Sequence, residues 1–231
     1  MNRVSRFALA DIFVVVGINL HAQQPSPSWA TGPSCDQLVG KDFVPYHQFT
    51  ADDFPVNDRV HPETAYWVRP FARPLYHFVS IQSPGGNFYL HITDWTVCSG
   101  LDKNESSRKS SARNSKQYLQ SAQAILDINE LYARHLAAVP LAELPSGEGK
   151  TFDEARAQLE SRVTLFGEKT FNQAAKEAKE FYEATSKGRE QKKVRELAAG
   201  IKKRLAALSA PTPASTASSS PMDRPTPTRS P

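Results

Sequence analysis

Two segments near the middle of the chain, Leu75–Ile81 and Phe88–Trp95, are rich in aromatic and β-branched residues. The stretch Ser83–Gly86 between them contains proline and glycine, which favour a tight reversal of the chain. The pattern predicts an antiparallel hairpin with a four-residue turn. In the simplest register, residue 77 pairs with residue 92 and residue 91 with residue 78, so that His77 and His91 point to opposite faces.

After about residue 110, apolar residues recur every three or four positions, which is typical of amphipathic helices. This pattern predicts a first helix over Gln117–Ala138. Thr151 and Glu154 have the spacing of a capping box, which predicts the start of a second helix, and Gly167 could divide that helix. The pattern predicts a third helix over Val194–Leu208. The predicted fold class is α+β, with a small antiparallel sheet in the first half packed against about three helices.

The two ends of the chain differ in composition from the middle. Residues 1–22 have a basic start, an apolar stretch and a cleavage point after Ala22, which predicts a secretory signal peptide, although Asp11 interrupts the apolar part. An ordinary N-terminal helix is the alternative. The clean apolar run Ile12–Leu20 is shorter than the roughly 20 residues that cross a membrane, so we expect no membrane span after signal cleavage.

The predicted domain organisation follows from these differences. Residues 23–39 form a linker, and residues 40–208 form a single α+β domain. Residues 209–231 are almost entirely proline, serine, threonine and alanine, which predicts a disordered tail. The expected location is exported, either periplasmic or extracellular.

Export changes the interpretation of the two cysteines. In an oxidising compartment, Cys35 and Cys98 would form a disulfide, which would stabilise the fold by roughly 4 kcal/mol through loop closure. Two free buried thiols are the alternative.

The charge of the 231-residue chain is modest, with a net value of +4, which does not indicate a nucleic-acid partner. Basic residues are nevertheless concentrated between Lys187 and Arg204. They could contact an anionic surface, although a solvated helix face is the favoured interpretation. The candidate residues are Lys192, Lys193, Lys202, Lys203 and Arg204.

No common catalytic motif is present in the sequence. It lacks a Gly-x-Ser-x-Gly elbow and a phosphate-binding glycine loop. No two histidines have the His-x-x-x-His spacing that places both on one helical face. A metal site formed by His61, His77 or His91 in the sheet half is the remaining enzyme alternative.

Three segments resemble a bacterial exported family of unknown function, whose members are described as predicted secreted zinc-dependent proteases. The family has a helix that reads roughly LLxHEQGHFDI, followed by xELYARxL. Here Leu119–Arg134 reads LQSAQAILDINELYAR, in which Gln123, Asp127, Ile128 and the ELYAR segment fit. Asp127 and Arg134 are two helical turns apart, so we expect them to have separate partners.

Two further segments agree with the family in order and spacing. Phe49–Phe54 is similar to its LTWxDF opening, and Glu63-Thr64 resembles the short motif that follows. Phe181–Gly188 is similar to its YDxETxHG segment, with Thr185 and Gly188 in place. The agreement covers most of the chain after the predicted signal and implies a metalloprotease-like fold.

The positions that would carry the chemistry differ. The HExxH residues of the family fall on Ser121, Ala122 and Ile125, and the histidine of the third segment falls on Lys187. None of these four supplies an imidazole to zinc, and Ala122 cannot act as the base. The resemblance therefore implies the fold without the activity.

The resulting hypothesis is an exported, catalytically inactive relative without a cofactor. It would act as a binding or scaffold protein on a protein, a peptide or an envelope component. The alternatives are an active metal-dependent hydrolase with a relocated metal site, and a structural envelope protein that uses its tail.

Overall fold

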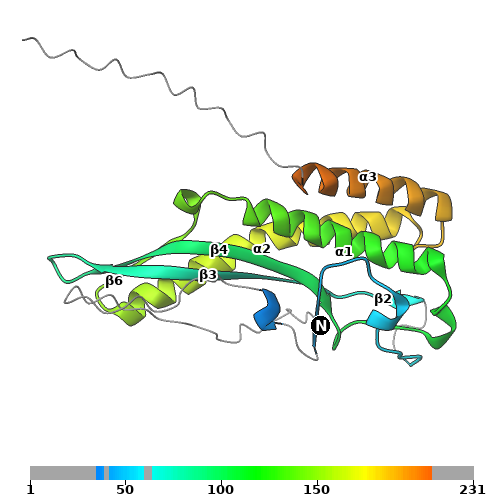
Figure 1. The fold of residues 1–231 in the computed structure, drawn as a ribbon, viewed down its shortest axis with the longest axis horizontal. Coiled ribbons are helices and arrows are strands. Elements are labelled where there is room, and N and C mark those ends of the chain that lie inside the picture. The colour runs from blue at the N-terminus through cyan, green and yellow to red at the C-terminus, as the bar shows by residue number, and fades with distance from the viewer. Residues whose placement is uncertain (1–34, 39–41, 60–63, 210–231) are drawn as a thin grey trace, which may run out of the picture.

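A computed structural model describes residues 35–38, 42–59 and 64–209 (Figure 1). The predicted signal peptide, most of the predicted linker and nearly all of the predicted tail lie outside the described residues. His61 and Glu63 also lie outside them. In the described part, no helix is both long and apolar enough to cross a membrane.

The main sheet is built around one long antiparallel hairpin. Strand β3 (Pro70–Gln82) pairs with β4 (Phe88–Asp102) over its whole length. The other edge of β4 pairs with β1 (Phe43–Pro45) at one end and with β6 (Ser146–Gly149) at the other. A separate two-stranded sheet joins the short strands β2 (Tyr66–Trp67) and β5 (Ser107–Arg108).

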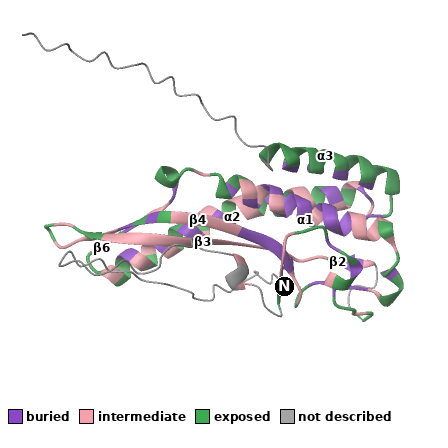
Figure 2. Ribbon diagram, viewed as in Figure 1, coloured by how far each residue is buried: buried purple, intermediate pink, exposed green. Residues whose placement is uncertain are grey.

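Three α-helices follow, so the predicted α+β fold is confirmed. Helices α1 (Lys116–Ala137) and α2 (Phe152–Ala184) pack against the sheet, and α3 (Gln191–Ser209) packs on α1 on the side away from the sheet (Figure 1). Figure 2 shows that α1 is largely buried between these neighbours, whereas α3 is mostly exposed. The short 3-10 helices are Cys35–Leu38, Ala51–Asp53, Ser110–Ala112 and Leu141–Glu143.

The start of α2 agrees with its predicted capping box. Thr151 Oγ1 accepts a hydrogen bond from the Glu154 amide at 3.2 Å, and the Glu154 carboxylate accepts one from the Thr151 amide at 3.2 Å. Gly167 does not divide the helix, which runs unbroken for 33 residues. A methyl group at Gly167 would meet Phe171 at an ordinary 3.7 Å, so packing does not require glycine there.

The predicted hairpin register is wrong. The Ser83 amide bonds to the Asn87 carbonyl, and Gly86 has a φ of 87°, so the loop is a three-residue turn with a glycine bulge. A second irregularity shifts the register after His77, which pairs with residue 94, whereas His91 pairs with residue 79. The two histidines therefore share one face of the sheet.

Strand β6 was not predicted, because its sequence is Ser-Gly-Glu-Gly. Its glycines are required by contact with the first turn of α2. A Cβ at Gly147 would lie 2.1 Å from the Ala155 carbonyl oxygen, and one at Gly149 would lie 2.5 Å from the Ala155 nitrogen. Glycine lets the strand lie directly on the helix backbone.

The predicted disulfide is present. Cys35 and Cys98 are bonded, with their Cα atoms 5.4 Å apart. Cys98 lies on β4 and is fully buried. The 3-10 helix at residues 35–38 belongs to the predicted linker. The disulfide therefore attaches this part of the linker to the centre of the sheet.

Candidate functional site

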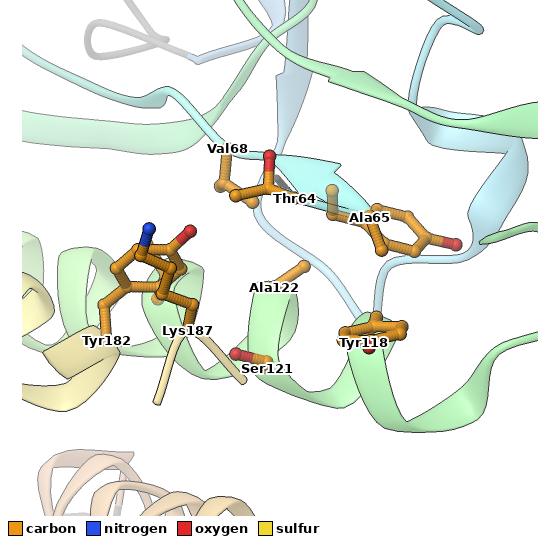
Figure 3. A pocket seen from close by; sticks show the side chains of 10 residues that line it. Thr64, Ala65, Val68, Tyr118, Ser121, Ala122, Tyr182 and Lys187 are labelled. Carbon is orange, nitrogen blue, oxygen red and sulfur yellow. The ribbon is translucent and has the colours of Figure 1, made fainter. Parts of the chain in front are cut away.

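The four positions aligned with the catalytic motif of the family lie together. Ser121, Ala122 and Ile125 from α1 and Lys187 from the turn after α2 line one pocket. The segment Thr64–Val68, around strand β2, covers the opposite side (Figure 3). Three segments that are far apart in the sequence therefore converge where the resemblance would place the active site.

The pocket is too small for a substrate. Its volume is about 20 Å³, which is room for roughly one water molecule. Ser121 and Ala122 are 5% and 2% exposed, so the helix face beneath it is closed. Figure 3 shows Lys187 beside Tyr182 at one side of the pocket and Tyr118 at the other.

The turn between α2 and α3 holds Lys187 in place. Ser186, Lys187 and Gly188 have φ values of 49°, 61° and 79°, so all three adopt the left-handed backbone conformation. Thr185 is fully buried, and its hydroxyl donates to the Phe181 carbonyl at 2.8 Å and accepts from the Gly188 amide at 3.2 Å. Two consecutive non-glycine residues in this conformation are costly, and such strain is concentrated at functional sites.

Gly188 is fixed by its contact with α1. A Cβ at this position would lie 2.8 Å from Ser121 Oγ and 3.0 Å from Ser121 Cβ. Gln117 also donates to the Gly188 carbonyl at 3.0 Å and to the Arg189 carbonyl at 2.8 Å. Thr185 and Gly188, the two positions of this segment that agree with the family, are therefore the ones that build the turn.

The residues present do not fit a zinc ion. Of the described residues that line the pocket, none is a histidine, cysteine, aspartate or glutamate. Ile125 offers no donor atom, Ala122 offers no base, and the ammonium group of Lys187 repels a cation. No hydrolytic step can be assigned to this pocket from its own side chains.

The adjacent face of α1 is polar and tightly bonded. Gln123, which is 3% exposed, accepts hydrogen bonds from the Phe49 amide at 2.7 Å and from the Gln48 side chain at 3.1 Å. It donates to the His47 carbonyl at 3.2 Å and to Asp127 Oδ1 at 2.7 Å. One amide thus uses all four of its hydrogen-bonding positions, and three of these bonds hold residues 47–49, before the 3-10 helix Ala51–Asp53, against α1.

Asp127 is the most buried charged residue of α1, at 1% exposure. Its Oδ1 also accepts a hydrogen bond from the Tyr46 hydroxyl at 2.8 Å. Burial, followed by the negative charge of Asp127, raises the pKa of Tyr46 well above its usual value. Asp127 Oδ2 is buried and has no hydrogen-bond partner among the described residues.

Glu130 and Arg134 continue the polar face. Arg134 Nε donates to Glu130 Oε1 at 2.6 Å, and the Ser99 hydroxyl of β4 donates to the other carboxylate oxygen. Asp127 and Arg134 therefore have separate partners, as expected. Of the helix positions that agree with the family resemblance, Gln123 and Asp127 attach α1 to the segment after β1, and Glu130 attaches it to β4.

Among the described residues, His77 and His91 of the sheet half do not assemble a metal site. His77 Nδ1 lies 3.9 Å from Asp94 Oδ2. His91 is on the same face, but in the described part of the chain no three potential ligands come together. His61 lies outside the described residues.

The basic residues of α3 fall into two groups. Lys193, Lys202 and Lys203 are exposed, and Lys192, also exposed, lies 4.0 Å from Glu196 one turn later. Arg204 instead forms a two-pronged ion pair with Glu177 of α2, which also accepts from the Tyr132 hydroxyl of α1 at 3.0 Å.

The ion pair of Arg204 joins the three helices. Burial alone would raise the pKa of Glu177, but the hydrogen bonds from Arg204 and Tyr132 outweigh it and lower the pKa. Arg204 is therefore committed to a contact within the fold, and the other four residues remain the candidates for an anionic surface.

Comparisons with protein families, with curated proteins and with solved structures gave no match to this chain. The family resemblance therefore depends on the motifs and on their positions in the fold.

Proposed function

We propose that this protein is an exported, catalytically inactive relative of predicted zinc-dependent proteases, and that it acts by binding a partner in the cell envelope. The observation that carries the proposal is the convergence of Ser121, Ala122, Ile125 and Lys187 on one pocket. Ser121, Ala122 and Ile125 share one face of α1 in any such helix, so the informative part of this observation is that Lys187, from a distant segment, meets them at the aligned position.

Two features support the proposal, the first on the absence of catalysis and the second on export. The pocket has no ligand set for zinc and no room for a peptide bond with its attacking water. The disulfide between Cys35 and Cys98 is typical of proteins in oxidising compartments, which agrees with export to the periplasm or the extracellular space.

A zinc titration tests this proposal. Calorimetry on the purified chain is expected to give no saturable heat, and zinc is expected to leave Tm unchanged. A one-to-one isotherm that is lost in His77→Ala or His91→Ala would contradict the proposal and would establish a relocated metal site. Lys192→Ala, an exposed substitution away from all of these residues, is the matched control.

A further inference from the structure

A second and much larger recess lies on the polar face of α1 that carries Gln123 and Asp127. It is a groove of about 270 Å³ between α1, α3 and the loop residue Gln48. Its volume approaches that of pockets that hold small molecules. Its lining residues are Gln48, Lys116, Leu119, Gln120, Gln123, Asp127, Ala198 and Lys202.

Asp127 gives the groove an acidic floor. It is the least exposed of the lining residues, at 1%, and its Oδ2 is the buried side-chain atom without a hydrogen-bond partner in the described chain. The neighbouring amide of Gln123 cannot supply this bond, because its donors are already used by His47 and by Asp127 Oδ1. A buried carboxylate oxygen without a donor is costly, so the site calls for an N–H or O–H group from outside.

The rim of the groove has the opposite charge. Lys116 and Lys202 are exposed, and neither forms an ion pair with another residue that the structure describes. Gln120, on α1 between Lys116 and Asp127, has a side-chain amide without a hydrogen-bond partner among the described residues. A ligand that matches the groove would therefore carry a hydrogen-bond donor for Asp127 Oδ2 and an anionic group for a rim lysine. Between them it would carry groups that can hydrogen-bond to the Gln120 amide.

The two lysines lie at different distances from the acidic floor. Lys116 is three helical turns before Asp127, roughly 16 Å along the axis. Helices α1 and α3 run in the same direction, since Gln117 contacts Arg189 at one end and Tyr132 shares Glu177 with Arg204 at the other. Lys202 therefore lies beside the Asp127 turn, and the neighbouring residues Ile201 and Ile128 belong to one buried cluster.

We infer that this groove binds a molecule that carries both a primary ammonium group and a carboxylate. The ammonium donates to Asp127 Oδ2 once the side chains that cover this buried oxygen shift aside, and the carboxylate pairs with a rim lysine. An extended peptide of about three or four residues would reach Lys116 once the lysine side chain bends toward it. A free amino acid would instead place its carboxylate at Lys202. This inference goes beyond the proposed function, because it requires neither the loss of zinc nor the family resemblance.

Calorimetry with trialanine and with alanine tests the inference. We expect saturable binding of at least one of them. N-acetyl-trialanine, which lacks the ammonium group, and trialanine amide, which lacks the carboxylate, are expected to bind at least tenfold more weakly than trialanine. If the ligand is a peptide, Lys116→Met should weaken trialanine binding by a similar factor, whereas if it is an amino acid, Lys202→Met should weaken alanine binding.

Two variants complete the experiment. Asp127→Asn keeps the side-chain shape and is expected to abolish binding, while Lys203→Met, an exposed lysine of α3 outside the groove, should leave it unchanged. Absence of heat with both ligands, or binding that is insensitive to blocking their termini, would overturn the inference. If Asp127→Asn does not fold, the two lysine variants and the blocked ligands still decide the question. A failed zinc titration leaves these results unaffected, so the two proposals can fail separately.

Discussion

Two adjoining faces of helix α1 have opposite character, although both are buried. The face with Ser121 and Ala122 closes a pocket of about 20 Å³ that contains no acidic or imidazole group. The face with Gln123 and Asp127 forms several hydrogen bonds to the segment around residues 46–49 and leaves only Asp127 Oδ2 without a partner among the described residues. Gln123 and Asp127, which agree with the family, lie on the second face, and the departures Ser121 and Ala122 lie on the first. Ile128 and Tyr132 also agree with the family, but they pack in the same apolar cluster as the departure Ile125. Residues that hold the fold and residues that would perform chemistry are thus only partly separated on α1.

The largest expected effect is on the polar face. Gln123→Leu removes four hydrogen bonds and leaves the buried Phe49 amide without an acceptor, so we expect the free energy of unfolding to fall by about 3 kcal/mol. Chemical denaturation measures the loss. Gln120→Leu, one turn earlier on the same helix, is the matched control and should cost less than about 0.5 kcal/mol. An equal fall in the free energy of unfolding for Gln123→Leu and Gln120→Leu would show that the hydrogen bonds of the polar face do not stabilise the fold.

The next effect is on the pocket face. Gly188→Ala places a Cβ 2.8 Å from Ser121 Oγ at a left-handed φ of 79°, and should cost about 2 kcal/mol. Adding Ser121→Gly removes the clash but keeps the backbone strain, so the double variant should be more stable than the sum of the two single changes predicts. Strict additivity in thermal or urea unfolding would show that α1 and the turn are not in contact there.

The smallest effect concerns Tyr46. Tyr46→Phe removes the donor to Asp127 Oδ1 and should cost about 1 kcal/mol at neutral pH. Because burial and Asp127 raise the pKa of Tyr46 in the folded state, the unfolded chain loses this proton first as pH rises above about 10. The wild type should therefore lose stability above pH 10 more steeply than Tyr46→Phe. Parallel pH profiles for the two proteins would contradict the assigned environment.

Much of the fold could be predicted from local pattern. The periodicity of α1 and α3 and the capping box of α2 gave the helices to within a few residues, because burial and capping act over one or two turns. The predicted hairpin register was wrong for two reasons. The glycine bulge at Gly86 changes the pairing at the turn, and the irregularity after His77 adds one residue within the β3–β4 ladder. Strand β6 was not predicted because glycine is unfavourable in strands. Its glycines are required by close contact with α2, and the local sequence gives no sign of that contact.

The candidate site was predictable only in part. The alignment of Ser121, Ala122, Ile125 and Lys187 identified positions that do meet in space. The groove was missed, since Lys116 and Lys202 are distant in sequence and each looks like an ordinary solvated lysine. The available signal was Asp127, a carboxylate among the inward-facing positions of the predicted helix, because a buried charge requires a partner that the sequence alone does not name.

The most direct test of the account is to restore the missing ligands. The variant S121H/A122E/I125H/K187H places two histidines one turn apart on α1 and a third on the facing turn, around the existing pocket. We predict that it binds one zinc ion per chain in calorimetry, whereas the wild type and a control with Lys192→His in place of Lys187→His bind far more weakly or not at all. If the folded variant takes up no zinc, or no more than the control, the pocket does not correspond to a metal site and the account is wrong.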